Sequence, residues 1–433
     1  MFDKKEANSK KTIYQEEAAL ASENANMILK WTTGTGKTRA AAEIMSKHLN
    51  IEKFFICVNE ISHIKNWENE LKEGGYQEIL DKCEIFCYAS LKKYCKRILK
   101  GDYGIGNSLF VFDEYHHISE NRFQLLKTIP IYKFTALSAT GTIESDYRLE
   151  NLSGLTSFPT MAHIINPNKA IKEGIVPEPK VNIIKVKLSN KGERTETYIK
   201  KKGKTTKDTP IYETTYPKRW EYLVDLKTTS NYILNILCTK KEKYKMIEED
   251  VEYAKKTFMR ESAIARKNSK PEPIWAKNKW LRAASVRKQF IAHCKTDMAK
   301  NIINTKLKNL RFITFTGSIN QCEELGKQGE IIHSKLSNKE CENIIFNFNN
   351  YVTDRIFCVI KLREGQNLNG IQAGLVIQLD NQTKSFTQEL GRVLRSSYPI
   401  FYVLVLEGTR DEVFFDTALA GLDESFINYI NIE

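Results

Sequence analysis

A run of small residues followed by a lysine and a threonine, from Trp31 to Thr38, has the composition of a phosphate-binding loop. An apolar run, Met27 to Leu29, precedes it, and an alanine-rich helical segment follows it. Glycines let backbone N–H groups approach phosphates, and the following helix points the positive end of its dipole at them. The strict template has a glycine at position 31, where this chain has tryptophan. The predicted nucleotide contacts are Thr33, Gly34, Thr35, Gly36, Lys37 and Thr38.

Two acids end a second apolar run and could serve the same nucleotide. Leu109 to Phe112 is followed by Asp113 and Glu114. In a nucleotide hydrolase the first acid binds Mg²⁺, together with the hydroxyl of Thr38, and the second orients or deprotonates the attacking water. An acidic pair at the end of a strand is more often only a turn. Its position after a phosphate-binding loop, on the same expected sheet, favours the catalytic interpretation.

Short apolar runs alternate with helical segments on both sides of a central region, and this alternation predicts an α/β fold. Parallel sheets covered by helices on both faces have this pattern, with the ligand site at the carboxyl ends of the strands. We therefore predict a domain over 1–188, an insertion over 189–305 and a second domain over 306–433. The runs are 54–58, 84–88, 109–112, 134–137, 312–315, 330–332, 356–360, 375–379 and 401–406.

The central region carries the excess positive charge of the chain. Residues 185–310 contain 31 Lys and Arg against 14 Asp and Glu, a net charge of +17, which leaves −4 for the rest of a chain whose total is +13. We expect a mostly helical, basic insertion with a possible hairpin at its start. A polyanion, above all nucleic acid, is the natural partner of such a surface, and the alternative is a basic face that is merely solvated. The predicted nucleic-acid contacts are Lys200, Lys201, Lys202 and Lys204.

The composition is that of a soluble protein with packed domains. Hydrophobic residues make up 41% of the 433 residues, no stretch is apolar enough to span a membrane, and the first residues lack the apolar core of a signal peptide. Nine cysteines without a C-x-x-C pair indicate reduced thiols. We expect a cytoplasmic protein that does not bind membranes.

With the next two residues, the acidic pair forms the segment Asp113 to His116, which resembles the DExH-box motif of superfamily 2 helicases. Further segments resemble motifs of this family in the same order along the chain. They are Tyr14 to Glu17, Phe55 to Leu71 with Trp67, Ser138 to Thr140, Phe312 to Thr316, Ile332 to Ser334, Leu362 to Leu368 and Gln388 to Arg395. Residues 170–177 also resemble the exit from the first lobe in the branch that contains transcription-repair and phage recombination helicases.

The resemblance implies two RecA-like P-loop NTPase domains and a role for each matched residue. Gln15 would read the adenine, the segment with Trp67 would grip a nucleic-acid backbone, and Gly365 would lie at the ATP site. Residues that couple hydrolysis to lobe movement would be His116, Ser138 and Thr140. Besides Glu114, the catalytic residues would be Gln388, Arg392 and Arg395, because arginines from the facing lobe stabilise the charge of the departing phosphoryl group.

We therefore expect a monomeric, ATP- and Mg²⁺-dependent helicase or translocase that acts on DNA. The abundance of lysine, asparagine and isoleucine suggests an AT-rich genome, such as that of a phage or mobile element, and hence the host cytoplasm. Three alternatives stay open at this point. They are a duplex translocase or restriction-type motor that does not separate strands, an RNA helicase, and an inactive helicase-like scaffold.

Overall fold

The fold is taken from a computed structural model. It describes residues 2–103, 107–188, 194–201, 220–223, 231–359, 368–379, 391, 393, 396–420 and 422–431. At residue 338 and at the described positions between 194 and 238, only the backbone is described.

The first sheet has six strands, all parallel, in the order β3-β2-β4-β5-β1-β6. Apolar side chains of α5, α6 and α7 pack on one face of this sheet against Phe110, Phe112 and Phe134. Helix α2 buries its alanine-rich side and packs against α1, α3 and β5. The elements are α1 (Lys4–Ala21), β1 (Asn26–Trp31), α2 (Lys37–Lys47), β2 (Lys53–Val58), α3 (Ile61–Glu73), α4 (Gln77–Asp81), β3 (Cys83–Cys87), α5 (Leu91–Leu99), β4 (Ser108–Asp113), α6 (Glu120–Leu126), β5 (Lys133–Ser138), α7 (Ile143–Ser153), β6 (Thr160–Ile165) and α8 (Pro167–Lys172).

The second sheet has seven strands in the order β12-β13-β11-β14-β15-β7-β16. Strand β7 precedes the insertion, within the range 1–188 that we assigned to the first domain, yet it pairs in parallel with β16 near the end of the chain. The elements are β7 (Lys180–Val186), α11 (Thr296–Thr305), β11 (Phe312–Thr316), α12 (Ile319–Leu325), β12 (Glu330–Ile332), α13 (Asn338–Asn349), β13 (Arg355–Val359), β14 (Ala373–Val376), β15 (Ile400–Leu406), α15 (Arg410–Leu419) and β16 (Ile427–Tyr429). The protein therefore contains two α/β lobes with parallel sheets, as the alternation of apolar runs predicts.

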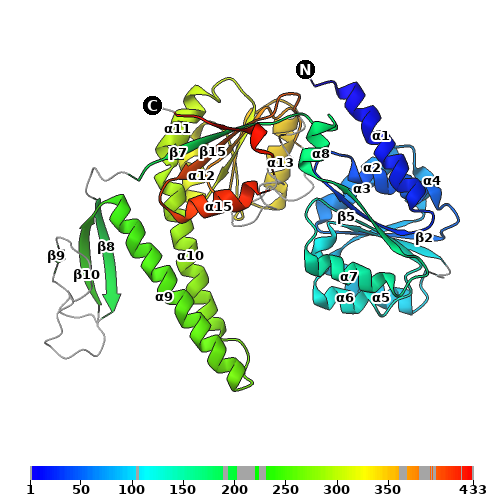
Figure 1. The fold of residues 1–433 in the computed structure, drawn as a ribbon, viewed down its shortest axis with the longest axis horizontal. Coiled ribbons are helices and arrows are strands. Elements are labelled where there is room, and N and C mark those ends of the chain that lie inside the picture. The colour runs from blue at the N-terminus through cyan, green and yellow to red at the C-terminus, as the bar shows by residue number, and fades with distance from the viewer. Residues whose placement is uncertain are drawn as a thin grey trace. The chain divides into compact units, whose positions relative to one another are not determined.

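The insertion contains a small antiparallel sheet and two long helices. Strands β8 (Arg194–Lys201), β9 (Trp220–Leu223) and β10 (Asn231–Cys238) pair in the order β8-β10-β9. Helices α9 (Lys240–Lys267) and α10 (Ile274–Cys294) lie side by side as a hairpin (Figure 1). Among its described residues the insertion is thus mostly helical, and its basic stretch Arg194–Lys201 forms a strand.

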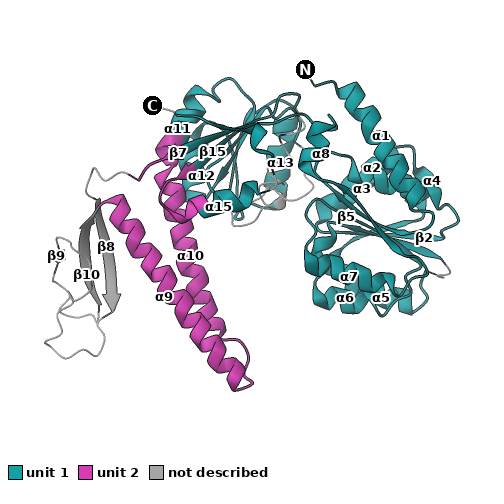
Figure 2. Ribbon diagram, in the orientation of Figure 1, with its two compact units in different colours: residues 1–184, 299–404, 413–433 teal, residues 185–298, 405–412 magenta. Residues whose placement is uncertain are grey.

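Two compact units divide the chain differently from the three ranges expected from the sequence (Figure 2). One unit contains residues 1–184, 299–404 and 413–433, and the other contains 185–298 and 405–412. Within the described residues, no helix combines the length and the apolar character needed to cross a bilayer.

Candidate nucleotide-binding site

The loop between β1 and α2 has the backbone geometry that phosphate binding requires. Gly34 and Gly36 both have φ of +87°, a conformation that other residues adopt only under strain, and Gly36 caps the N-terminus of α2. The Thr35 hydroxyl donates a hydrogen bond to the Thr32 carbonyl at 2.7 Å and so closes the turn. The loop therefore turns directly into the helix N-terminus, where free N–H groups and the helix dipole favour an anion.

The Lys37 side chain contacts the backbone carbonyl of Trp31 and not its indole. The Lys37 ammonium donates to the Trp31 carbonyl at 3.1 Å. The Trp31 indole is fully buried and donates to Nδ1 of His163, on the neighbouring strand β6, at 2.8 Å. Trp31 therefore packs within the lobe and does not narrow the phosphate-binding loop.

The predicted acidic pair lies at the carboxyl end of β4, in the same sheet as the loop. Asp113 is the last residue of β4, and Glu114 follows with φ of +48°. Burial, reinforced by the Glu114 charge, raises the pKa of Asp113 from 3.8 to about 6, while Trp67 and Lys37 act in the opposite direction. The positive charge of Lys37 offsets only part of the cost of a desolvated carboxylate beside a second acid, so the donor set fits a divalent cation such as Mg²⁺.

Trp67 holds Asp113 in place. Its side chain on α3 is 1% exposed, and its indole N–H donates to Oδ2 of Asp113 at 2.9 Å. The resemblance assigned the segment with Trp67 to gripping nucleic acid, and within this segment the Trp67 side chain is buried against Asp113. No local sequence pattern indicates this role of Trp67, because its partner lies 46 residues away in the chain. The phenol of Tyr88, also missed, donates to the backbone carbonyl of Asp113 at 3.1 Å.

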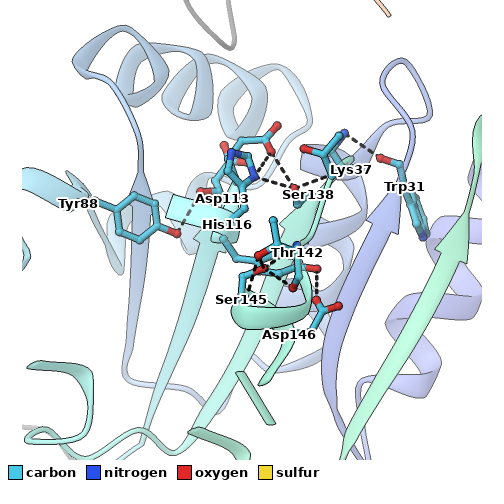
Figure 3. A network of polar contacts seen from close by, with 12 residues as sticks. Trp31, Lys37, Tyr88, Asp113, His116, Ser138, Thr142, Ser145 and Asp146 are labelled. Atoms are coloured by element: carbon cyan, nitrogen blue, oxygen red, sulfur yellow. Dashed lines mark hydrogen bonds and ion pairs between the residues drawn. The ribbon is translucent and has the colours of Figure 1, made fainter. Parts of the chain in front are cut away.

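The three predicted coupling residues meet around Glu114, and two of them, His116 and Ser138, are labelled in Figure 3. The Ser138 hydroxyl donates to Glu114 Oε2 at 3.1 Å and accepts the Thr140 N–H at 3.0 Å. His116 Nδ1 lies 2.9 Å from the same hydroxyl and 3.3 Å from the Glu114 carboxylate. A displacement of the Ser138 to Thr140 segment would therefore directly change the hydrogen bond to the Glu114 carboxylate.

A second set of contacts fixes the segment that follows. The Tyr115 hydroxyl donates to one oxygen of Asp146 at 2.7 Å, and Lys30 forms an ion pair with the other oxygen at 2.7 Å (Figure 3). A Cβ at Gly141 would lie 1.9 Å from the Tyr115 hydroxyl, so only glycine fits there. Strand β1, the turn that follows β4 and helix α7 are thus held together next to Glu114.

Gln15 lies beside the phosphate-binding loop, as the resemblance implies. Its side chain is 8% exposed, and its amide donates to the Gly36 carbonyl at 3.4 Å. A cavity of about 220 Å³ lies against Gly34 of the loop, and no local pattern indicates it because its walls come from helix α1 and from a distant segment. It is lined by Phe2, Lys4, Ala7, Asn8, Lys11, Gly34, Val176 and Pro177.

Several predicted site residues lie outside the described residues or the described side chains. Lys200 and Lys201 belong to strand β8, of which the backbone is described. Those outside the described residues are Lys202, Lys204, Gly365, Gln388, Arg392 and Arg395. Within the described residues, the structure brings together the residues of the first lobe that were predicted to form the ATP site and its coupling segment, from Gln15 to Thr140.

Two family models match the chain, one over each lobe. Residues 5–145 match the res subunit of type III restriction enzymes, and residues 294–397 match the helicase conserved C-terminal domain. Together they span more than half of the chain and include the loop, the acidic pair and the second sheet. The chain belongs to helicase superfamily 2. Membership implies an enzyme that hydrolyses nucleoside triphosphates and acts on nucleic acid.

Solved helicase structures share the fold of this helicase. The helicase domain of Hef from Pyrococcus furiosus is 14% identical, with a TM-score of 0.53 over 93% of this chain and 97% of that chain. Dbp5 from S. cerevisiae, bound to RNA and ADP BeF3, is 12% identical, with a TM-score of 0.55 over 94% and 85%. The DEAD-box helicase Mss116, bound to ssRNA and UDP-BeF, is 12% identical, with a TM-score of 0.55 over 97% and 74%. A comparison with curated protein sequences found no match.

Proposed function

We propose that this helicase is an ATP-dependent DNA helicase or translocase of the DExH type. The observation that carries the proposal is the arrangement around Glu114. A water-activating carboxylate, a coupling segment and a phosphate-binding lysine lie at the carboxyl ends of neighbouring strands of one sheet. This arrangement can link hydrolysis to movement, because Ser138 contacts Glu114 and precedes a segment that closure of the lobes would displace.

In this proposal the first lobe holds the nucleotide and its metal. Thr33 to Thr38 bind the phosphates, Gln15 recognises the base, and Thr38 and Asp113 hold Mg²⁺, which when bound neutralises charge on the phosphates. Glu114 accepts a proton from the attacking water or orients it. Gly365 contributes from the second lobe, and Gln388, Arg392 and Arg395 complete the site when the lobes close.

Hydrolysis by a lysine variant tests the proposal. Lys37→Ala should lower the ATPase rate at least a hundredfold, since a charge aimed at the terminal phosphates is lost. Lys47→Ala removes an exposed lysine at the other end of the same helix and should hydrolyse at the parent's rate. Equal rates for the parent and Lys37→Ala would eliminate the motor.

The nucleic-acid preference is a separate part of the proposal. DNA is favoured by the resemblance of residues 170–177 to a branch of DNA helicases. RNA is the second candidate, because Dbp5 and Mss116 were both solved bound to RNA. Stimulation of the ATPase by single-stranded DNA, duplex DNA and RNA distinguishes them, and we expect DNA to stimulate more. A strand-displacement assay then separates a helicase from a duplex translocase, which would hydrolyse ATP without releasing a strand.

We also propose that Lys200, Lys201, Lys202 and Lys204 contact phosphates and that the protein acts as a cytoplasmic monomer, with a phage or mobile element as its source. The basic insertion and the helicase family support the first of these points.

A further inference from the structure

The positive charge of the α9–α10 hairpin is concentrated in its distal half. Residues 255–288 contain 11 Lys and Arg against 2 Asp and Glu, a net charge of +9. The base of the hairpin, residues 240–254 with 289–294, contains 4 against 5, a net charge of −1. Both halves belong to the same pair of helices, so the helical fold itself does not require this asymmetry.

Five of these eleven Lys and Arg lie on one side of the hairpin together with two aromatic residues. Residues three or four apart share a helix face, and Lys279 of α10 lies 4.9 Å from the ring centre of Tyr253 of α9, which joins a face of each helix. We call this joint surface the hairpin face. Its exposed residues are Tyr253, Lys256, Arg260, Ile264 and Lys267 of α9 and Trp275, Lys279, Arg282 and Val286 of α10.

Two tryptophans of α10 have different environments. Trp280 is partly buried and stacks on Phe258 of α9, with ring centres 5.5 Å apart, so it stabilises the hairpin. Trp275 is 60% exposed at the start of α10. Its indole shares the hairpin face with lysines and arginines and presents a flat apolar surface in an electropositive region. Nucleic acid matches this combination, because its phosphates satisfy the cations and an unpaired base can stack on the ring.

We propose that the hairpin face binds single-stranded nucleic acid, with its lysines and arginines contacting phosphates and Trp275 stacking on a base. This inference rests on the proposed function, because it gives the motor a contact for its strand outside the two lobes.

Binding without nucleotide tests the inference independently of hydrolysis. The probe is a fluorescently labelled single-stranded DNA of about 20 bases, titrated with the full chain while anisotropy is read at several salt concentrations. Trp275→Ala should raise Kd about 5- to 150-fold, the range for loss of one stacked base, and Trp275→Phe should recover part of the loss. The matched control is Ile274→Ala, which removes an exposed apolar side chain from the neighbouring position.

A pair of charge variants tests the phosphate contacts. Lys256→Gln/Lys267→Gln should reduce the slope of log K against log salt by about 1.4, the value for two contacts on a single strand. Lys241→Gln/Lys245→Gln removes two exposed lysines from the base of α9 and should leave the slope unchanged. Parent-like binding by both Trp275→Ala and the face pair, or equal weakening by the two charge pairs, would overturn the inference. If the parent protein showed no ATPase activity but the face variants still weakened its DNA binding, only the proposed motor function would be refuted.

Discussion

Asp113→Asn should stabilise the first lobe at neutral pH while abolishing hydrolysis. The carboxylate is buried beside Glu114, and its pKa rises from 3.8 to about 6 in the folded protein. The two values are about two pH units apart, and each unit corresponds to about 1.4 kcal/mol. Because Asp113 and Glu114 share the effect, we expect a gain of about 1–3 kcal/mol when the charge is removed.

The sign of the pH dependence follows from proton linkage. A carboxyl group whose pKa is raised by folding binds more protons in the folded state between the two pKa values, so its contribution to stability is lost as pH rises from about 4 to about 6. The asparagine variant has no carboxyl group at position 113, so its stability does not fall with pH for this reason. Its advantage over the parent should therefore be largest above pH 6 and shrink as pH falls toward 4. The asparagine oxygen can still accept the indole N–H of Trp67.

Thermal unfolding in EDTA, without nucleotide, at intervals between pH 4.5 and 8 measures this advantage. A gain of a few degrees in Tm is expected at pH 8, with a smaller gain at pH 4.5. Asp146→Asn is the matched control, since it weakens an ion pair with Lys30 at 2.7 Å and should give no stabilisation at any pH. An Asp113→Asn variant whose Tm advantage does not change with pH would refute the burial argument.

Three other substitutions test separate contacts. Trp67→Phe should shift the acidic limb of the ATPase pH profile to higher pH. In the parent the indole N–H lowers the pKa of Asp113, so its loss raises that pKa. An acidic limb at the parent's pH would rule out this role of Trp67. Gly36→Ala should weaken nucleotide binding and lower Tm, because the added Cβ would lie 2.4 Å from the Gln15 amide. Gly75→Ala is the control. Gly75 has a similar φ of +79° but open space around the added Cβ, so this variant should lose less Tm. Lys295→Met should cost about 3–5 kcal/mol, because it removes the ammonium that pairs at 2.7 Å with the fully buried Asp411 carboxylate, and Lys295→Met/Asp411→Asn should recover most of this loss. Equal unfolding free energies for the two variants would contradict this expectation.

The parts of the site that the sequence predicted are those whose signal is local. The phosphate-binding loop and the acidic pair each consist of adjacent residues at the end of an apolar run, so residue type and spacing indicated them. The Ser138 to Thr140 segment is equally local, and the family resemblance indicated it. The two parallel sheets were predicted for the same reason. The pairing of β7 with β16 was not, because parallel pairing between distant segments leaves no periodicity in either one.

Contacts between distant residues explain the remaining differences. Trp67 has the same neighbours in sequence whether it faces nucleic acid or Asp113, and only the packing of α3 decides between them. The raised pKa of Asp113 likewise depends on burial, which an acidic pair at a strand end does not reveal. Similarly, alternating lysines and tryptophans on α10 do not indicate which tryptophan is exposed until α9 is placed beside it.

Tryptophan at position 31 is compatible with phosphate binding because the loop uses only the backbone of this residue. The positive φ values that demand glycine occur at Gly34 and Gly36, whereas Trp31 is the last residue of β1. Its carbonyl accepts the Lys37 ammonium, and any residue type can supply that carbonyl. Its side chain is used instead to join β1 to His163 on β6, the edge strand of the sheet. The tryptophan that differs from the template thus makes a structural contact between strands β1 and β6, and the backbone geometry of Gly34 and Gly36 does not depend on it.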